Sequence, residues 1–590
     1  LRQTDDLNRD VGSNYGPLFD LIMPEILARG DHARAVRLSL EEAARTQDLL
    51  PDITMQALMN AARGFRGLGM RERAHSAARE AIQLSEAAME LSAGGELQRV
   101  RSSEPVAECY ELAADLALDG GDVKEALALV EHGRGRMLYA MIESGRPRAD
   151  EIGAADRTTR TRLEQRLSQL NVALDRAVAA ENRNEIDRLQ DALLDAQRQH
   201  QSFVGGLSAR GERRMAALRP LQTALDEVLD QLPGQLALIE YVVRENEIHA
   251  FVVRRSEASS PIRATHTIRI GRKALDARVD KLVAMIANPD LRYSAAASEL
   301  YALLIRPLER DLAGAVALCI VPDEALWRVP FAALMDDQGR FLIERTAIFH
   351  AASMTVYAAM ANRHEASAVP EHQVLALANP TLDRNVAKEL ASYFRGTTFG
   401  TLEDAEREVD AIRDIYGPSH CVVLKREEAT EARAKEEMQS ARILHFATHG
   451  VLDDRNPLYS RLMFARDAQA GDDGSLEAWE IARLKIDADL VVLSACNTAR
   501  GMIGGGEGVV GIAWAFFAAG ARSTIATGWN IGSRSASDVM VGFHQALRSR
   551  EGEPLAKARA LRDAQLQLIH GTNTRHPFYW AAFVLLGDGS

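Results

Sequence analysis

The stretch ARILHFATHG (441–450) and the stretch DLVVLSACNT (489–498) decide the fold, because each contains an apolar run that ends in polar residues. Residues 443–447 and 490–493 are short and rich in branched or aromatic side chains, which predicts two buried parallel strands. Parallel strands deliver the residues at their carboxyl ends into one crevice. We therefore expect His449 and Cys496 to be neighbours. A base beside a thiol is the minimum set for a thiolate nucleophile.

The glycines that follow these strands suit the same chemistry. The backbone N–H groups of Gly450 and Cys496 would form an oxyanion hole without any side chain. Residues 504–506 are three glycines, which predict a flexible loop beside the thiol. Glu507 is then expected to open an apolar helix over 509–519, since a carboxylate suits the positive end of a helix.

Four motifs in order resemble the CHAT domain, a caspase- and separase-like cysteine peptidase: HFATHG (445–450), LSACNT (493–498), GEGVVGIAWAFFAAGARS (506–523) and HPFYWAAFVLLGD (576–588). The resemblance covers roughly residues 236–587. It implies a caspase-type α/β sandwich whose catalytic dyad is His449 and Cys496. The spacing of 47 residues between them agrees with the ~50 of caspases. The motif Q-A-C-[RQG]-G is absent, so this is not an ordinary caspase.

The composition is that of an ordinary globular protein of several domains, with 590 residues, 47% hydrophobic and 26% charged. A formal net charge of −13 disfavours a nucleic-acid binder, since phosphate contacts need clustered Lys and Arg. The four cysteines are far apart without CxxC spacing, which disfavours a zinc ribbon or disulfide framework and fits a reducing compartment. We expect no transmembrane span, no signal peptide and a cytoplasmic location.

Residues 1–147 predict helical repeats. A glycine is followed five residues later by an alanine three times, at Gly30 and Ala35, Gly69 and Ala74, and Gly121 and Ala126. This spacing is typical of tetratricopeptide repeats, in which the glycine makes the turn between two antiparallel helices, although the units begin further apart than the ideal ~34 residues. A generic helical bundle is the alternative. Such repeats expose a concave surface suited to a substrate or an activator.

Residues 148–231 predict a long helical hairpin that connects the repeats to the C-terminal half. Apolar residues recur three and four apart, at 163, 167, 170 and 174 and again at 186, 189, 193 and 196. A turn is expected near 181–184. An intermolecular coiled coil is the alternative, but the run is short and interrupted for one.

From residue 232 the pattern switches from helix to strand. Residues 232–369 are expected to form a non-catalytic, pseudo-protease-like front lobe, with a hairpin over 236–253, helices at 273–287 and 298–308, and strands at 316–321 and 341–350.

Residues 370–590 are expected to form the catalytic lobe, with strands at 374–378, 421–424 and 580–586 and helices at 403–416 and 430–439. This alternation predicts a mainly parallel sheet. The predicted fold class is therefore an N-terminal all-α part with TPR-like repeats and a long hairpin, followed by an α/β caspase-like (CHAT) domain.

Each candidate site residue could also have a role other than catalysis. Cys496 could be an inert buried thiol, but it follows a strand and precedes a glycine-rich loop. His449 could be a turn histidine, or a metal ligand together with His445. Those two would lie about 13 Å apart at ~3.3 Å per residue, which is too far for one ion, so we expect no metal and no cofactor. His445 is better explained as a core residue. Asp453 and Asp454 are expected to shape the loop rather than orient His449.

The substrate pocket is less sharply marked. Many CHAT-like sequences carry an acidic pair soon after the position of Trp529, whereas here the chain reads Asn530, Ile531, Gly532, Ser533. A preference for basic residues would need an acidic pocket, and the remaining candidate acids are Asp538, Glu507 and Asp453. A small or apolar preferred residue is an equal alternative.

These observations favour a regulated cysteine endopeptidase. The resemblance implies a bacterial defence or signalling role and a dedicated protein substrate, such as a gasdermin or a CRISPR-linked protein. The alternative is a TPR scaffold whose peptidase fold is unused or self-inhibited. A thiol acyltransferase would use the same thioester with another acceptor.

Overall fold

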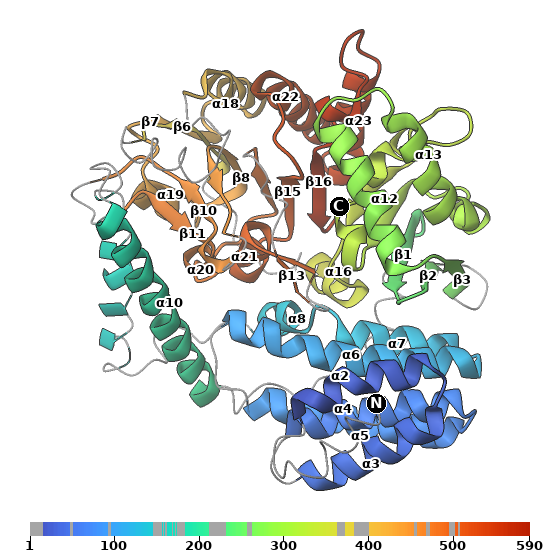
Figure 1. Ribbon diagram of the computed structural model, residues 1–590. Coiled ribbons are helices and arrows are strands. Elements are labelled where there is room, and N and C mark those ends of the chain that lie inside the picture. Colours follow the sequence, from blue (N-terminus) through green and yellow to red (C-terminus); the bar gives the residue numbers. More distant parts are fainter. Residues whose placement is uncertain are drawn as a thin grey trace. The chain divides into compact units, whose positions relative to one another are not determined.

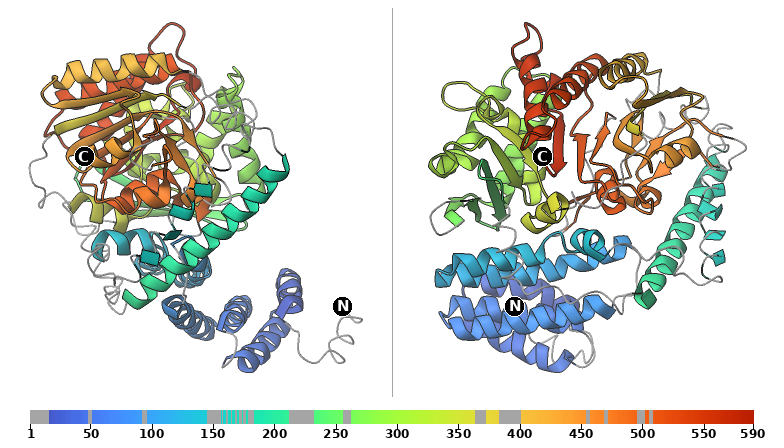
Figure 2. Two further views of the ribbon diagram at one scale, coloured as in Figure 1. Left: turned by 90° about the vertical axis from the view of Figure 1, so that its left-hand side faces the viewer. Right: turned by 180° about the vertical axis from the view of Figure 1, so that it is seen from behind.

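A computed structural model of the chain (Figures 1 and 2) describes residues 16–47, 51–91, 96–144, parts of 156–177, 183–211, 232–255, 262–362, 372–382, 401–453, 457–467, 472–494, 502–504 and 508–590. The chain divides into two compact units, Leu1–Ala93 with Arg99–Arg134, and Gly94–Gln98 with Gly135–Ser590. The boundaries of the four domains expected from the sequence stay predictions. Within the described ranges, no helix combines the length and apolar character needed to cross a bilayer.

In its described residues, the first unit is built from helices. They are α2 (Gly16–Ala28), α3 (His32–Thr46), α4 (Pro51–Gly67), α5 (Arg71–Leu91), most of α6 (Glu96–Gly120) and α7 (Val123–Gly133). The predicted all-α character of this part of the chain is thereby confirmed.

The three repeated glycines end their helices in the same way. Gly30, Gly69 and Gly121 have φ of +75°, +72° and +82°, the left-handed region that glycine adopts without strain. After each glycine, the next N–H donates to a carbonyl five residues back, at 2.9 to 3.2 Å, which is the Schellman pattern. The alanines five residues after the glycines, at 35, 74 and 126, are completely buried. The periodic glycine and alanine therefore mark one recurring helix–turn–helix unit.

We expect Gly121→Ala to destabilise the helical unit by about 1 kcal/mol, because an L-residue in the left-handed region costs roughly 1–2 kcal/mol. Gly120→Ala is the matched control. Gly120 is the last residue of α6, and alanine there should be neutral or stabilising by up to about 1 kcal/mol. A Cβ at either position would meet nothing within 4 Å, so the pair isolates backbone conformation. Hydrogen exchange of the α6 and α7 amides measures the difference, and equal protection in both variants would contradict this reasoning.

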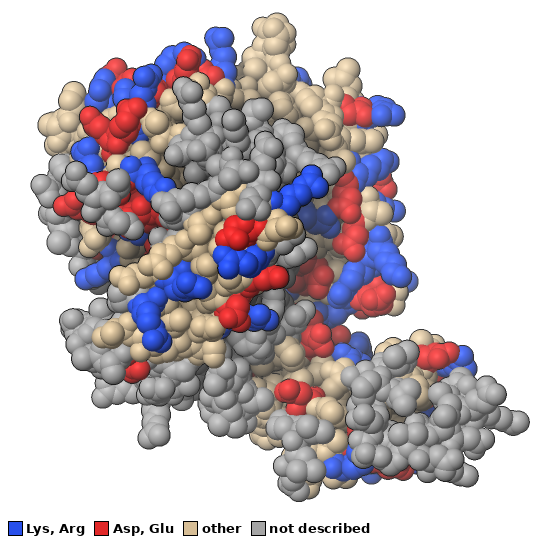
Figure 3. Space-filling model, turned by 60° about the vertical axis from the view of Figure 1, so that its left-hand side comes forward, with Lys and Arg blue, Asp and Glu red and all other residues tan. Residues whose placement is uncertain are grey.

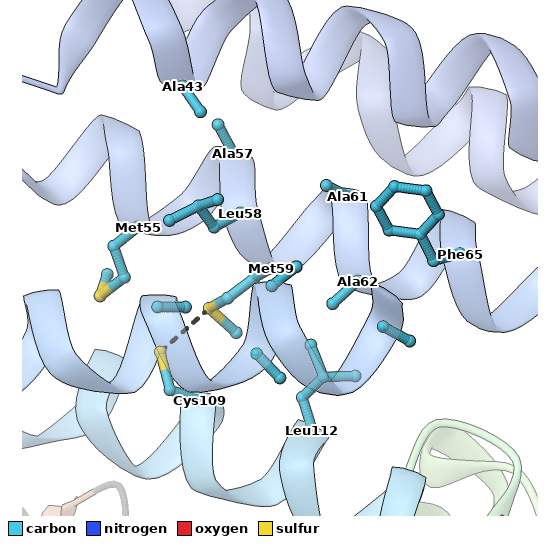
Figure 4. Packing of buried hydrophobic residues seen from close by; sticks show 14 of the residues in the cluster. Ala43, Met55, Ala57, Leu58, Met59, Ala61, Ala62, Phe65, Cys109 and Leu112 are labelled. Atoms are coloured by element: carbon cyan, nitrogen blue, oxygen red, sulfur yellow. Dashed lines mark hydrogen bonds between the residues drawn. The ribbon is translucent and has the colours of Figure 1, made fainter. Parts of the chain in front are cut away.

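Small side chains let these helices pack closely. The core is rich in alanine, with Ala57, Ala61 and Ala62 of α4 all unexposed. Figure 4 shows the side chains between α4 and α6, where the Cys109 thiol donates to the Met59 sulfur at 3.4 Å. Burial raises the pKa of Cys109 to about 12, so this thiol stays protonated at neutral pH.

In the described part of the second unit, α8 (Arg136–Ser144) and α10 (Arg183–Gly211) precede the sheet. The described residues of 156–177 are helical as well, as expected for the long hairpin. His200 of α10 is buried edge-on against Trp479, with ring centroids 4.7 Å apart, so α10 packs against the later part of this unit. Its exposed arginines pair with acids three residues before, as in Glu185 with Arg188. On the face drawn in Figure 3, basic and acidic side chains are likewise interspersed over the described part.

The large sheet has eleven strands. They are β1 (Leu236–Val243), β2 (Glu247–Arg254), β3 (Ile262–Arg269), β4 (Ala317–Val321), β5 (Ala347–His350), β6 (His372–Pro380), β7 (Cys421–Arg426), β8 (Ala441–Ala447), β12 (Leu490–Leu493), β15 (Ser523–Thr527) and β16 (Phe583–Gly587). Their order is β3-β2-β1-β4-β5-β16-β15-β12-β8-β6-β7. Neighbours pair in parallel except β3–β2, β2–β1 and β16–β15, so the mainly parallel sheet is confirmed.

Helices and short turns surround this sheet. They are α12 (Arg272–Ala287), α13 (Tyr293–Leu304), η2 (Arg306–Leu308), α14 (Glu309–Leu312), η3 (Glu324–Arg328), η4 (Phe331–Ala333), α15 (Leu342–Arg345), α16 (Met354–Ala361), α18 (Glu403–Tyr416), α19 (Glu431–Glu437), η6 (Pro457–Tyr459), α20 (Ala478–Ile481), α21 (Ile512–Ala519), α22 (Ser533–Ser549), α23 (Ala556–Ile569) and η7 (Pro577–Tyr579). Two small sheets add β9 (Gly450–Val451), β10 (Arg461–Met463) and β11 (Ser475–Glu477), and β13 (Met502–Gly504) with β14 (Gly508–Val510).

The side chains of β8 show which helices cover which face of the sheet. His445 contacts Glu408 of α18 and His544 of α22 on one face. On the other face, Phe446 stacks on Phe516 of α21, with ring centroids 5.7 Å apart. The strand is therefore buried on both sides, as a run of apolar residues in a parallel sheet requires.

Three local predictions are wrong. The strand expected over 341–350 begins as helix α15, because the Glu344 carboxylate accepts the Phe341 N–H at 2.6 Å and caps a helical turn. The helix expected over 509–519 begins only at Ile512, because β14 pairs with β13 instead. The strand expected from 580 begins at Phe583, after a turn in which the Trp580 indole donates to the Arg575 carbonyl at 3.1 Å.

Candidate active site

Two neighbouring parallel strands end at the same edge of the large sheet. β8 pairs with β12 in four positions, from Ile443 opposite Leu490 to Phe446 opposite Leu493. His449 follows Phe446 by three residues, and Cys496 follows Leu493 by three. Cys496 itself lies outside the described residues, as do Asp454 and Glu507. The predicted pairing of the two strands is thus present up to the last described positions before the thiol.

The backbone of Met463 fixes the segment that carries His449. The Met463 N–H donates to the His449 carbonyl at 2.9 Å, and the Thr448 hydroxyl donates to the Met463 carbonyl at 2.6 Å. Thr448 is 2% and His449 is 9% exposed, so both lie under the surface in this conformation. Met463 belongs to β10, so the small sheet holds the end of β8 through the backbone N–H and carbonyl of this residue.

Thr448→Val is expected to destabilise the second unit by about 1–2 kcal/mol, because the isosteric side chain leaves the buried Met463 carbonyl without its hydroxyl donor. Thr448→Ser keeps the hydroxyl and is the matched control. All five tryptophans lie between residues 327 and 580, so urea unfolding followed by tryptophan fluorescence reports on this unit. Equal midpoints for the two variants would show that the hydrogen bond is not stabilising.

The candidate pocket residues fall into two groups on either side of β12. Asp453 follows β9, on the β8 side, and its N–H donates to the Ser460 hydroxyl at 3.0 Å. Trp529 and Asn530 follow β15, which is the other neighbour of β12. The Trp529 indole is buried and donates to the Phe578 carbonyl at 3.3 Å, whereas Asn530 is exposed.

The remaining pocket candidates belong to α22. The Ser533 hydroxyl, at the first residue of α22, donates to Asp404 of α18 at 2.5 Å. Asp538 is exposed on the second turn of the same helix. The hydrogen bond from Ser533, together with the nearby arginines Arg407 and Arg534, lowers the pKa of Asp404. Asp404 is thus a carboxylate near the Ser533 segment that the sequence pattern did not single out.

His445 is the core residue that the sequence predicts, and its burial is complete. The sequence did not reveal its partners, Glu408 and His544, which are also buried. A signal existed for both, because each occupies an apolar position of an amphipathic helix. Glu408 is in line with Ala405, Val409 and Ile412, and His544 follows Phe543 on the buried stripe of α22. In the described ranges, no group of three or more His, Cys, Asp or Glu could hold a metal ion.

Relatives of known sequence match about half of the chain. Human and mouse "Tetratricopeptide repeat protein 28" are each 25% identical to it, over 346 and 348 residues. These matches take up 51% of this chain but only 13% of either relative, so the chain spans a small part of their length.

Two solved structures are similar to the chain at low sequence identity. The separase–securin complex of Saccharomyces cerevisiae has a TM-score of 0.38 and 10% identity, covering 93% of this chain and 48% of that one. The Arg-specific cysteine proteinase gingipain R (RgpB), from Porphyromonas gingivalis, has a TM-score of 0.33 and 10% identity, covering 54% of this chain and 74% of that one.

The family model named "CHAT domain" matches residues 294–588, which is half of the chain and includes every strand from β4 to β16. This chain therefore belongs to the CHAT domain family.

Proposed function

We propose that the chain is a cysteine endopeptidase whose dyad is His449 and Cys496. The register of β8 and β12 carries the proposal. Every paired position in it is separated by the same 47 residues that separate His449 from Cys496. If the segments after β8 and β12 keep this register for three more residues, the imidazole and the thiol meet at the carboxyl edge of the sheet.

In this mechanism His449 takes the proton from the Cys496 thiol, and the thiolate attacks a peptide carbonyl. The tetrahedral oxyanion is stabilised by the amides of Gly450 and Cys496. The intermediate collapses to a thioester, and the amine leaves with the proton from His449. Water then attacks the thioester, with His449 as its general base, and restores the free thiol.

The β9–β10 pair supports the role of Gly450. Because the Met463 N–H bonds to the His449 carbonyl, Gly450 and Leu462 are opposite each other at a position that exchanges no ladder hydrogen bonds. The Gly450 N–H is consequently directed away from β10 and is not consumed by the ladder. Such a donor costs nothing to redirect when an oxyanion forms.

The low exposure of His449, 9%, favours an enzyme that is held idle until it is engaged. The helical unit is then the natural receptor for a dedicated protein substrate, such as a gasdermin or a CRISPR-linked protein, or for an activator. Trp529, Asn530 and Ser533 would line one side of the pocket, and Asp453, Glu507 and Asp538 would supply its charge. The widely spaced cysteines support a location in the reducing cytoplasm. The resemblance to CHAT peptidases supports a role in bacterial defence or signalling.

A peptide with a thiol-reactive group tests the proposal, because the other thiols are shielded. Cys109, Cys319 and Cys421 are buried, and burial raises the pKa of Cys421 to about 11. We expect covalent labelling of the folded chain that is lost in Cys496→Ser. If a small thiol reagent modifies Cys496 while the peptide probe does not, the scaffold interpretation is favoured. Labelling that survives in Cys496→Ser would overturn the dyad.

A further inference from the structure

Four buried polar side chains form one hydrogen-bonded chain beneath the candidate site. Glu408 Oε1 lies 2.7 Å from His445 Nε2, and His445 Nδ1 lies 3.1 Å from His544 Nε2. His544 Nδ1 lies 3.2 Å from the Tyr416 hydroxyl. The two histidines are completely unexposed, Glu408 is 2% and Tyr416 is 5% exposed.

The hydrogen-bond donors of these four side chains can all point in the same direction along the series. The Glu408 carboxylate can accept from His445 Nε2, and a neutral His445 ring then accepts at Nδ1. His544 then donates from Nε2 and accepts the Tyr416 hydroxyl at Nδ1. Burial holds the pKa of His544 well below its ordinary value, which keeps that ring neutral, as this order requires. Each ring nitrogen of His445 and His544 has a partner, so removing one residue leaves its neighbour without a hydrogen bond.

The chain joins three elements that are far apart in the sequence. Glu408 and Tyr416 belong to α18, His445 to β8 and His544 to α22. His445 lies four residues before His449 on the same segment. α22 begins at Ser533, directly after the loop that carries Trp529 and Asn530. The same three elements thus lead to the candidate base and to the candidate pocket.

Simple packing does not require this arrangement. An apolar side chain at each position would fill the space without the cost of burying polar atoms. A fully satisfied polar network, by contrast, accepts only one relative placement of its elements, because a shift leaves a buried group without its partner. The geometry therefore suits a device that sets position rather than one that only fills volume.

We propose that His445 is a positioning residue for the candidate catalytic base, and that it acts through the chain of Glu408, His544 and Tyr416. This inference rests on the proposed function. The hydrogen bonds fix the position of β8 relative to α18 and α22. They thereby fix the position of the His449 ring relative to the reacting bond. None of the four residues needs to touch the substrate.

Two substitutions at His445 separate hydrogen bonding from packing. His445→Gln can still donate to Glu408 and accept from His544, whereas His445→Phe fills the site and does neither. With a peptide identified from the cleaved partner, His445→Phe is expected to lower kcat by ~10- to 100-fold with KM little changed, since a displacement of about 1 Å at the reacting groups has effects of that size. His445→Gln should retain most of the activity. Equal kcat for both variants would overturn the proposal.

Tyr416→Phe covers the case in which His445→Phe does not fold. It deletes one hydroxyl at the far end of the chain, and we expect a fall in kcat of ~2- to 10-fold with no change in KM. An unchanged kcat in this folded variant would count against transmission through the chain.

A spectroscopic measurement tests the positioning role of His445 independently of the peptidase proposal. In Cys496→Ala protein labelled with ¹⁵N-histidine, the ring signals of His449 should move in His445→Phe and stay in place in His445→Gln. If the wild-type chain cleaves nothing, that pattern would still support the positioning role while the peptidase proposal ends. A His449 signal that ignores both substitutions would overturn the positioning role, whatever the activity.

Discussion

Cys496→Ala is expected to lower kcat/KM for the cleaved peptide bond on the order of 10⁴-fold or more, because no other group can form the thioester. His449→Ala should lower it by a similar factor, since the thiol then has no base to take its proton. The activity is measured as new peptide termini by mass spectrometry, on substrate recruited by the full chain.

The two substitutions should not add. Groups that act as a unit lose nearly everything when either is removed, so the double variant should be no worse than the more damaging single one. An additive loss would show that the two residues act independently and would contradict a dyad.

Matched controls use a cysteine and a histidine of a different strand region. Cys421 is a buried thiol at the start of β7, and His420, beside it, is exposed. Cys421→Ser and His420→Ala should keep full activity, because β7 is the outermost strand of the sheet, beyond β6 and β8. Cleavage that survives in Cys496→Ala but is lost in Cys421→Ser would move the nucleophile to the edge strand.

The large elements could be predicted because each depends on a local pattern. Gly30, Gly69 and Gly121 each have a positive φ angle, which glycine adopts more readily than other residues, so the glycine itself is a local signal of the turn. The runs that became β8 and β12 are apolar except for Arg442 and His445, as expected of strands buried on both faces. Neither inference needs any knowledge of a distant residue.

The missed features all depend on partners that sequence distance hides. The apolar residues 341–343 look like the start of a strand, but the Glu344 carboxylate caps a helical turn there. Glu408 and His544 look like ordinary polar residues of amphipathic helices until His445 meets both. Such contacts link positions 37 and 99 residues apart, and no local pattern records them. The pairing of the two strands that precede His449 and Cys496 could be predicted. The hydrogen bonds of His445 with Glu408 and His544 could not.

Lys557→Met is expected to lower the free energy of unfolding of the second unit by about 3–5 kcal/mol, the usual effect of removing one partner of a buried ion pair. Lys557 is 2% exposed. Its ammonium lies 2.8 Å from Asp489 and 3.6 Å from Asp588, and it donates to the Ser523 hydroxyl at 2.9 Å. Methionine keeps the length of the side chain but leaves both carboxylates buried without this charge. The exposed Lys485, changed to Met, is the control, with an expected effect within about 0.5 kcal/mol.

The pH dependence of this loss identifies its cause. Burial alone would raise the pKa of Asp489, but Lys557 and Arg522 hold it below the ordinary aspartate value of 3.8. A lowered folded-state pKa stabilises the fold above that ordinary value, and the stabilisation is lost as the pH falls through the folded pKa. The wild-type chain should therefore lose part of its advantage over Lys557→Met as the pH drops below 3.8, in urea titrations followed by tryptophan fluorescence. An advantage that stays constant across that range would mean that Lys557 stabilises the unit through packing of its stem, and that its charge on Asp489 contributes nothing.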